Sequence, residues 1–460
     1  MIGGEVATAI DTWHGLLRPD VELGEAHWLA LAARMREAKL TFGDRLNCPF
    51  LRRFFLSEED AARIAHASET IAGVGETVVA AAVSSMPDLL DAVGLNEAER
   101  RLVAIDPGYP RASTSSRVDA VLLPETLAFA EYNAEAPAGL GYTENLAEIF
   151  DTLPIMARFR ERFAARYHRL GEGILEALLA SYREWGGTAS PPQVLITDWR
   201  EVPTWNEFLI LQARFEGLGV PTVVADPRDL EFDGRQLTAG GRRIDLVYRR
   251  VLINDIVARP DDCRALVEAC RAGAVCMANS LRCKIPHKKA FFAVLTDERY
   301  AALFTGEQRA VIAACVPWTR VVADVPVTAG GRRTGLLDLV RRDRETFVLK
   351  PSDEYGGTGV TLGWETSPGD WDDAIQRALA SPAPWIAQRR IPVRREVFPI
   401  VETPFRVVMR EMLVDFAPYL FRGRVAGFLT RLSATGLANV TSGGGQVPSF
   451  VVSALPGSGA

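Results

Sequence analysis

The feature that most constrains this chain is an apolar run that ends in a lysine and is followed by a glycine cluster, within residues 347–360. Lys350 ends the run, and the glycines that follow are Gly356, Gly357 and Gly359. This pattern predicts two strands joined by a flexible loop whose backbone N–H groups can face an anion. The lysine adds a positive charge suited to phosphate. Because the lysine precedes the glycines, the segment is not a Walker A loop, and a plain hairpin turn is the alternative interpretation.

The composition indicates a soluble globular protein with two or three lobes. The chain has 460 residues, of which 48% are hydrophobic and 24% charged. Its formal net charge of −6 gives no electrostatic support for nucleic-acid binding. The six cysteines are irregularly spaced and include no Cys-x-x-Cys pair, which predicts reduced thiols in a cytoplasmic protein. We expect no membrane span and no signal peptide, because the necessary apolar segments do not occur in the sequence.

Changes in residue pattern divide the chain into six expected segments. Residues 1–110 have the apolar spacing of a helical lobe, whereas residues 111–150 contain short strands. The segments expected after these are a helical connector at 151–190, a small α/β lobe at 191–280, two further lobes at 281–450, and a disordered tail at 451–460.

A second group of polar residues lies on the strands predicted near the start of the 111–150 segment. Period-two alternation places Glu131 and Asn133 on the same face of one strand, and Asp119 belongs to the strand before it. Carboxylate and amide oxygens suit Mg²⁺, which usually shares its ligand shell with substrate phosphates. A solvated strand edge explains the same residues, and the pattern alone does not choose between the two interpretations.

The α/β lobe carries polar residues where its predicted strands end. Strand, helix and strand follow one another between residues 193 and 252, which predicts a parallel sheet. Ligands of such sheets gather outside the carboxyl ends of the strands. The residues found there are Asp198, Arg200, Arg249 and Arg250. Surface ion pairs that bind no ligand are the alternative interpretation.

Together these motifs resemble the nucleotide-binding lobes of the ATP-grasp family. The resemblance is carried by Asn279-Ser before Lys288, Val348-Leu-Lys350-Pro with the glycine cluster, Ile386-Ala-Gln388, Arg406, Arg431, and Asn439 before a glycine run. In that family the magnesium-binding acid and Glu-x-Asn elements come last, whereas the matching Asp119 and Glu131-Tyr-Asn133 come early here. The rotated order resembles the circularly permuted ATP-grasp proteins, a group similar in layout to glutathionylspermidine synthase.

This resemblance implies a mixed α+β and α/β fold. Circularly permuted ATP-grasp lobes would surround an embedded parallel α/β lobe, after an N-terminal helical region. Segment 111–150 would supply the permuted metal-binding strands, and segment 281–450 would form the nucleotide-binding lobes.

The resemblance also implies a role for each candidate residue. Lys288 and Lys350 would contact the phosphates of ATP beneath the glycine loop, with Lys284 and Lys289 as alternatives to Lys288. Gln388 and Ile391 would line the adenine site. The expected ligands of Mg²⁺ are Asp119, Glu131 and Asn133, helped by Asn439. Arg431 would face the transferred phosphoryl group, and the α/β strand-end residues with Arg111 would recognise the substrates.

The implied activity is ATP- and Mg²⁺-dependent joining of a carboxylate to an amine through an acylphosphate. Such an intermediate needs protection from water, and the loop of Gly356 and Gly357 is the expected lid. We expect small-molecule acid and amine substrates of the amino acid, peptide or polyamine class, and no nucleic-acid or membrane partner. Two alternatives stay open, which are an ATP-grasp phosphotransferase and a non-catalytic protein that binds a nucleotide or peptide.

Overall fold

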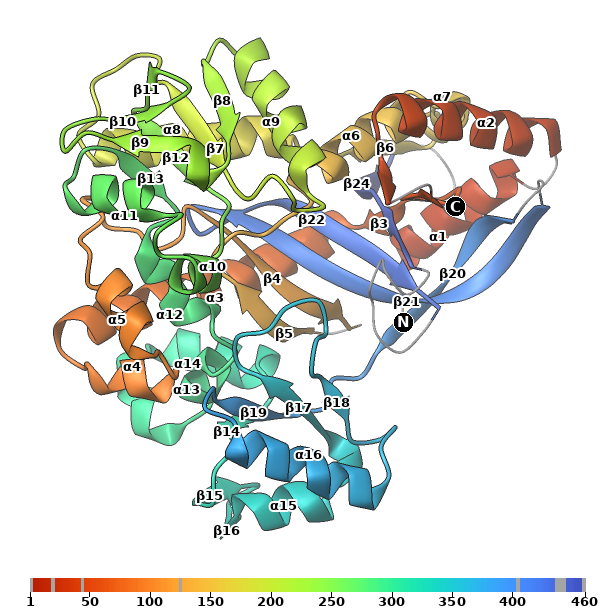
Figure 1. Ribbon diagram of the computed structural model, residues 1–460. Helices are drawn as coiled ribbons and strands as arrows, with labels where there is room; N and C mark the ends of the chain where they lie inside the picture. Colours follow the sequence, from red (N-terminus) through yellow and green to blue (C-terminus); the bar gives the residue numbers. More distant parts are fainter. Residues whose placement is uncertain are drawn as a thin grey trace.

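The largest sheet of the molecule joins strands from the early and the late parts of the chain (Figure 1). The computed structural model describes residues 3–17, 21–42, 45–123, 126–402, 406–434 and 444–456. The strand order is β23-β22-β21-β4-β5, and β20 pairs with β21. The strands are β4 (Ser115–Leu122), β5 (Leu127–Asn133), β20 (Arg394–Glu402), β21 (Arg406–Phe421), β22 (Arg424–Ser433) and β23 (Gly445–Val447). Antiparallel pairing of β4 with β21 brings early and late segments together, as expected for a circularly permuted order of motifs.

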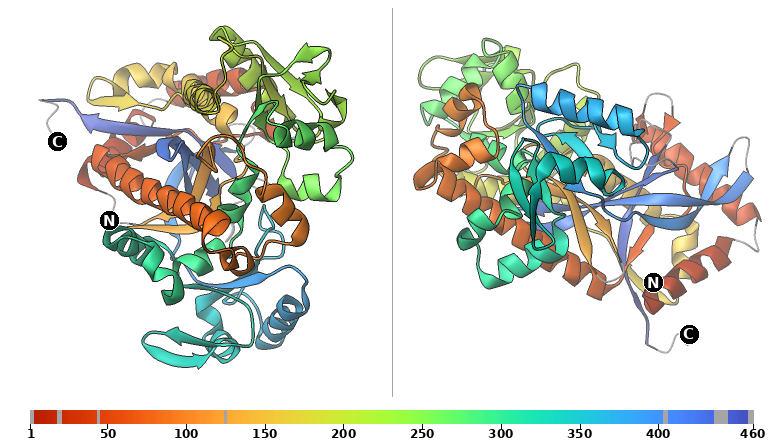
Figure 2. Two further views of the ribbon diagram at one scale, coloured as in Figure 1. Left: turned by 90° about the vertical axis from the view of Figure 1, so that its left-hand side faces the viewer. Right: turned by 90° about the horizontal axis from the view of Figure 1, so that it is seen from below.

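The N-terminal region is mainly helical, and one long helix covers the sheet. Helix α3 (Glu58–Ser84) begins where the Ser57 side chain accepts a hydrogen bond from Asp60 N, at 3.0 Å. Its apolar face includes Ile64 and Ile71, and the helix lies against β21 and β22 (Figure 2). The other elements of this region are α1 (Gly4–Leu17), α2 (Val21–Glu37), β1 (Thr41–Phe42), β2 (Arg45–Leu46), β3 (Phe54–Leu56), α4 (Asp88–Ala92) and α5 (Glu97–Val103).

The C-terminal strand corrects one expectation. Residues 451–454, predicted as part of a disordered tail, belong to β24 (Ser449–Ala454). This strand pairs with β3 in parallel and with β6 (Phe163–Arg166) antiparallel. The prediction was wrong there because the apolar side chains of Val451 and Val452 are buried in the main core. Residues 457–460 lie outside the described residues.

The predicted parallel α/β lobe is present in the middle of the chain. Its sheet has the order β13-β12-β7-β8, and every neighbouring pair is parallel. Its strands are β7 (Val194–Thr197), β8 (Thr222–Ala225), β12 (Leu246–Arg249) and β13 (Cys276–Ala278). Around them lie α8 (Leu170–Glu184), α9 (Trp205–Gly217), η1 (Pro227–Asp229), β9 (Leu230–Phe232), β10 (Leu237–Ala239), β11 (Arg242–Arg243), α10 (Ile253–Ala258) and α11 (Arg264–Arg271).

The lysine and glycine segment belongs to a small antiparallel lobe at the lower end of the molecule in Figure 1. Its sheet has the order β14-β19-β17-β18, and its elements are β14 (Thr319–Val321), β15 (Pro326–Ala329), β16 (Arg332–Gly335), α15 (Leu336–Arg342), η4 (Arg344–Thr346), β17 (Phe347–Pro351), β18 (Thr361–Leu362), α16 (Pro368–Ala380) and β19 (Trp385–Arg389). The buried Phe347 and Leu349 of β17 share a core with Trp371 of α16. That packing fixes one face of the sheet and leaves Lys350, at the end of β17, to face the rest of the molecule.

The remaining elements connect these parts. They are α6 (Leu140–Asp151), α7 (Pro154–Phe159), η2 (Leu281–Cys283), α12 (Lys284–His287), α13 (Phe291–Leu295), η3 (Glu298–Leu303) and α14 (Gly306–Cys315). None of the helices in the described ranges is both long and apolar enough to cross a membrane.

Candidate active site

Two neighbouring cavities meet where the antiparallel lobe faces the large sheet. The smaller cavity has a volume of about 220 Å³, and its lining includes Lys289, Lys350, Gln388 and Ile391. The larger cavity, of about 550 Å³, reaches from the large sheet to the α/β lobe. The residues that line both cavities are Ala130, Glu131, Gly357 and Asp415. A group bound in one cavity can therefore reach a group bound in the other across this common wall.

Lys350 offers an unneutralised positive charge to the smaller cavity. Its ammonium donates to Gln388 Oε1 at 2.8 Å and to the carbonyl oxygen of Ala130 at 3.3 Å. Both partners are uncharged, and pairing of β17 with β19 fixes Gln388 beside the lysine. Burial lowers the pKa of Lys350 to about 8, although the nearby Glu131 opposes the shift. An anion in this cavity would favour the charged form of the lysine.

The second lysine that lines this cavity is Lys289, whereas the family resemblance predicts Lys288 as the phosphate contact. Lys289 Nζ lies 3.2 Å from Glu131 Oε2, and it also donates to the carbonyl oxygen of Glu354. Lys288 is 4% exposed and lines neither cavity. Helix α12 ends at His287 and the backbone becomes extended at Lys288, so the two successive lysines point to different places. That change of direction is not visible in a Lys-Lys pair of the sequence.

Lys288 belongs instead to a buried network of ion pairs. Its ammonium lies 2.7 Å from Glu99 Oε1 and 2.6 Å from Asp353 Oδ2. Lys284, the other alternative, lies 2.7 Å from Asp353 Oδ1 and 3.5 Å from Glu135 Oε2. These carboxylates already neutralise both lysines. Asp353 also anchors the start of the glycine loop through this network.

The glycine loop closes over the two cavities. Gly356 and Gly357 have φ values of +65° and +81°, a left-handed conformation that favours glycine. Gly357 lines both cavities, and the 65% exposed side chain of Tyr355 lines the larger one. At Gly359, a Cβ atom would lie 2.7 Å from Pro351 Cγ, so this position also excludes a larger residue. The loop thus borders both cavities.

The predicted acid and amide side chains converge on the common wall. Asp119 of β4 and Glu131 of β5 are direct partners in the strand register. Asn133 Nδ2 donates to Glu131 Oε1 at 3.1 Å, which places these two residues on one face as alternation predicts. Burial opposes the charged form of Glu131, but Lys289 and Lys350 hold its pKa below the ordinary value. Glu131 is therefore ionised at neutral pH.

Two arginines hold Asp119 in place. Arg117 Nε donates to Asp119 Oδ1 at 2.7 Å, and Arg431 Nη2 donates to Asp119 Oδ2 at 2.8 Å. Burial opposes ionisation of Asp119, yet the arginines lower its pKa to about 2. Arg431, on β22, also pairs with Asp415 on β21, its partner in the register. Burial raises the pKa of Asp415, which Arg431 only partly offsets.

The donor chemistry of this wall fits Mg²⁺. Asp119, Glu131 and Asn133 provide ionised carboxylate and amide oxygens, which are the ligands that Mg²⁺ prefers. Within the described ranges, no group of three or more His, Cys, Asp or Glu side chains is arranged to hold a metal by itself. Phosphate oxygens of a bound nucleotide would therefore complete the shell. Asn439, the fourth predicted ligand, lies outside the described residues.

Two further charged residues at the site were missed at the level of sequence. Arg117 stands two positions before Asp119 on β4, so strand alternation could have placed both on one face. The position of Asp415 at the site follows from the pairing of β21 with β22, which aligns it with Arg431 and is not evident from the sequence.

The predicted substrate-binding residues lie elsewhere. None of Arg111, Asp198, Arg200, Arg249 and Arg250 lines the smaller or the larger cavity. Arg249 is fully buried, 3.2 Å from Glu135 Oε1, and Arg250 donates to the carbonyl oxygen of Pro137 at 2.8 Å. Arg200 forms an exposed ion pair with Asp229. The α/β lobe reaches the larger cavity through Thr204 and Leu252 instead.

Two of these strand-end residues fasten the lobe to the rest of the chain. Arg249 and Arg250 bind the segment that follows β5, at Glu135 and Pro137. The carboxylate of Asp198 accepts a hydrogen bond from Trp199 N at 2.8 Å, and burial raises its pKa to about 6. These contacts position the segment that lines the larger cavity, which includes Pro137.

Comparisons with known proteins show the family of the chain. A sequence model described as circularly permuted ATP-grasp type 2 matches residues 123–440. A protein of Frankia casuarinae provisionally named glutamate–cysteine ligase 2-2 is 26% identical over 294 residues, which are 60% of this chain and 31% of that protein. An uncharacterized protein of Mycobacterium tuberculosis is 26% identical over 346 residues, which are 70% of this chain and 57% of that protein.

One solved structure shares the fold over nearly the whole chain. It is the apo form of a glutathione synthetase-like effector from Globodera pallida, with a TM-score of 0.58 and 12% identity. The match covers 94% of this chain and 97% of that chain. The present chain, by contrast, spans about a third to a little over half of the two sequence relatives.

Proposed function

Because this chain belongs to the circularly permuted ATP-grasp type 2 family, we propose that it is an ATP- and Mg²⁺-dependent ligase that joins a carboxylate to an amine. The relatives named for glutamate–cysteine ligation and the glutathione synthetase-like neighbour support a ligase that acts on small amino-acid or peptide substrates. The observation that carries the proposal is the common wall of the two cavities. Glu131, Asp415 and Gly357 line both, so a nucleotide on one side would meet an acid on the other.

The first step would form an acylphosphate. A carboxylate oxygen of the acid in the larger cavity attacks the γ-phosphorus of ATP, and ADP leaves. Lys350 and Lys289 would bind the phosphates from the smaller cavity, since one has uncharged partners and the other faces Glu131 at the common wall. Arg431 and Arg117 would stabilise charge that develops on the transferred group from the side of the large sheet.

The second step would form the amide. The amine nitrogen attacks the acyl carbon, the carbon–oxygen bond to phosphate breaks, and the nitrogen loses a proton. The glycine loop would exclude water from the acylphosphate, which is otherwise hydrolysed. Bound at Asp119, Glu131 and Asn133, Mg²⁺ would neutralise phosphate charge and orient the γ-phosphoryl group.

The proposal is tested by the dependence of ADP release on both substrates. Purified protein is given Mg·ATP with a panel of carboxylic acids, with and without a panel of amines that includes amino acids, small peptides and polyamines. We expect one acid and amine pair to raise ADP release well above the rate with the acid alone. A new amide of the summed mass minus water should accumulate in proportion to ADP.

Two results would replace the proposal. Full-rate ADP release without any amine, together with a stable phosphorylated product, indicates a phosphotransferase. Binding of Mg·ATP with no turnover on any acid indicates a nucleotide-binding protein without catalysis. A folded Glu131→Ala variant with the wild-type rate would remove Glu131 from the metal site.

A further inference from the structure

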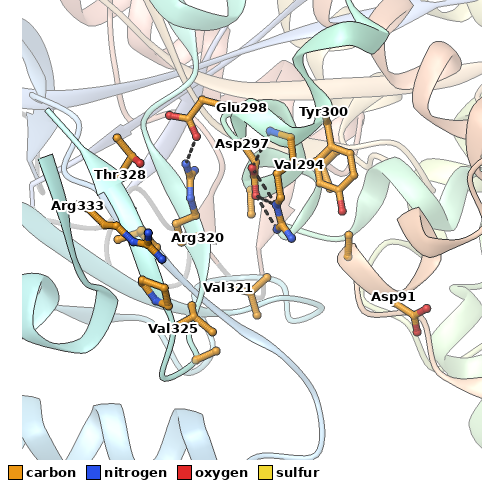
Figure 3. Close-up of a pocket in the computed structure, with 16 residues that line it drawn as sticks. Asp91, Val294, Asp297, Glu298, Tyr300, Arg320, Val321, Val325, Thr328 and Arg333 are labelled. Carbon is orange, nitrogen blue, oxygen red and sulfur yellow. Dashed lines mark hydrogen bonds and ion pairs between the residues drawn. The ribbon is translucent and has the colours of Figure 1, made fainter. Parts of the chain in front are cut away.

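A third cavity lies on the far edge of the antiparallel lobe, away from the common wall. Its volume is about 570 Å³, and it shares none of its lining residues with the smaller or the larger cavity. One side consists of β14 and the β15–β16 hairpin, and the other of α4, α13 and η3 (Figure 3). The third cavity therefore lies between the antiparallel lobe and the helical part of the protein.

The walls of this cavity are largely apolar. The apolar lining includes Val294, Val321, Val327 and Tyr300. Figure 3 labels Val321 on one side of the cavity and Val294 and Tyr300 on the other. At Val325, 43% of an apolar side chain remains exposed to solvent in this cavity. Contact with an apolar or aromatic body would remove that surface from water, which is favourable.

Arg320 brings an incompletely compensated charge into this apolar setting. The residue is 8% exposed, and its guanidinium donates to Thr296 Oγ1 at 3.0 Å and to the carbonyl oxygen of Thr319 at 2.8 Å. Both acceptors are uncharged. Its one carboxylate partner among the described residues is Glu298, at 3.6 Å, whose own side chain is 71% exposed. The exposed Glu298, and the nearby Asp297 that already pairs with Arg299, compensate this buried guanidinium only in part, so an added anion would be bound favourably.

A second arginine, Arg333 on β16, lines the same side of the cavity (Figure 3). Arg333 is exposed on this strand, and none of the ion pairs among the described residues involves it. The other charges of the lining are already matched, since Asp297 pairs with Arg299 and Asp91 pairs with Arg100. Of the three arginines and three carboxylates in the lining, Arg333 alone has no ion-pair partner among the described residues.

We propose that this third cavity is a second ligand site, which binds a small organic anion with an apolar or aromatic body between Arg320 and Arg333. The anion is a phosphate or a carboxylate, and the valine-rich walls hold the body that carries it. The site is separate from the proposed ligase reaction, so it can be tested by binding alone.

Strand β14 connects this site to the nucleotide side. Arg320 and Val321 line the third cavity, whereas the preceding Thr319 accepts a hydrogen bond from Gln388 Nε2 at 3.2 Å. Gln388 in turn accepts from Lys350 in the smaller cavity. An anion that pulls on β14 and bridges the antiparallel lobe to α13 and η3 would change the position of Gln388. Occupancy of the site is therefore expected to change nucleotide affinity, and by linkage the nucleotide changes anion affinity equally.

The test uses calorimetric titration with two probes, 2-naphthyl phosphate and 2-naphthoate, with uncharged 2-naphthol as the reference. A saturating non-hydrolysable ATP analogue keeps the smaller cavity occupied. We expect at least one anionic probe to bind about tenfold more tightly than 2-naphthol, as charge-assisted hydrogen bonds predict. The tighter of the two anions identifies whether the site takes a phosphate or a carboxylate.

Matched variants assign the binding to this cavity. Arg333→Glu should weaken the preferred anion about tenfold or more, whereas Arg332→Glu, which changes an exposed arginine outside the cavity lining, should not. Equal binding of the anions and 2-naphthol, or equal behaviour of the two variants, overturns the site.

The coupling is measured as the change in affinity for the ATP analogue with added anion. If the added anion still changes the affinity for the ATP analogue in Arg333→Glu, the anion competes directly and the coupling is overturned. If that change in affinity disappears in the variant, the coupling is supported.

Discussion

Two pairs of lysines near the two cavities differ in what their charges can do. Lys289 and Lys350 line the smaller cavity, where Lys350 has only uncharged hydrogen-bond partners. Lys284 and Lys288 are buried against Asp353, Glu99 and Glu135. The comparison shows that Lys350 keeps its charge open to a bound anion because its hydrogen-bond partners are uncharged, whereas Lys289 shares its charge with Glu131 at the common wall.

The difference follows from where each lysine finds its partner. The carboxylates that neutralise the buried pair come from α5, from the segment after β5 and from the start of the glycine loop. These three pieces are far apart in the chain, so the lysines connect them. Lys350 instead has a neighbour of its own sheet, Gln388, as its partner. One pair is expected to stabilise the fold and the other to bind ligand.

Loss of a buried lysine should have the largest effect. Lys284→Met leaves Glu135 and Asp353 short of a buried positive charge. We expect the free energy of unfolding to fall by about 3–5 kcal/mol, the usual result of breaking a buried ion pair from one side. Urea unfolding followed by circular dichroism measures the change. Lys350→Met is the matched control, and an equal loss in both variants would contradict the distinction between the two pairs.

Loss of a lysine that lines the cavity should lower turnover more than stability. Lys350→Met is expected to lower ATP turnover by about 10²–10³-fold, the size of effect seen when one charge-stabilising group is removed from an active site. Its free energy of unfolding should change little, because the partners of Lys350 are uncharged. Steady-state ADP release and urea unfolding are measured on the same preparation. Normal turnover in this variant would exclude Lys350 as a phosphate ligand.

The pH dependence of nucleotide affinity provides a finer comparison. Free Lys350 has a pKa of about 8, and a bound phosphate favours its charged form. Nucleotide binding therefore takes up a proton above pH 8, and affinity should fall as pH rises, approaching about tenfold per pH unit. Below pH 8 the lysine is already charged and contributes no slope.

The control for this pH effect is Lys350→Arg, whose side chain stays charged throughout the range. Titrations of the non-hydrolysable ATP analogue between pH 7 and 9.5 measure both proteins. A decline of the same slope in the arginine variant would assign the titration to another group.

Local pattern was sufficient for some parts of this site. Strand alternation is enough to place Glu131 and Asn133 on one face, and their side chains are hydrogen-bonded at 3.1 Å. The strand that ends at Lys350 and the turn after it are also evident from residue type alone. The permuted fold was recognised through the order of motifs rather than through any one of them.

Other parts depend on contacts that sequence pattern does not contain. Arg431 reaches Asp119 across 312 positions of the chain, through pairing of β21 with β4 and β22. Whether Lys288 or Lys289 faces the cavity depends on a backbone turn after α12. Arg249 was expected at a ligand, but its partner is Glu135, 114 positions away. Long-range pairing decided the two arginine cases and a local change of backbone direction decided the lysine case, so residue type alone decided none of them.

The smallest effect is expected at Arg200, which shares its predicted role with Arg249 but not its environment. Arg200 is 63% exposed at the side chain and pairs with a half-exposed Asp229, whereas Arg249 is fully buried against Glu135. Arg200→Ala should change the free energy of unfolding by less than about 1 kcal/mol, because solvent and salt screen exposed ion pairs. Turnover should also be unchanged, since the side chain lines neither the smaller nor the larger cavity. Urea unfolding and a full substrate titration of ADP release measure both quantities. A raised KM for the acid with unchanged stability would indicate that Arg200 contacts the substrate.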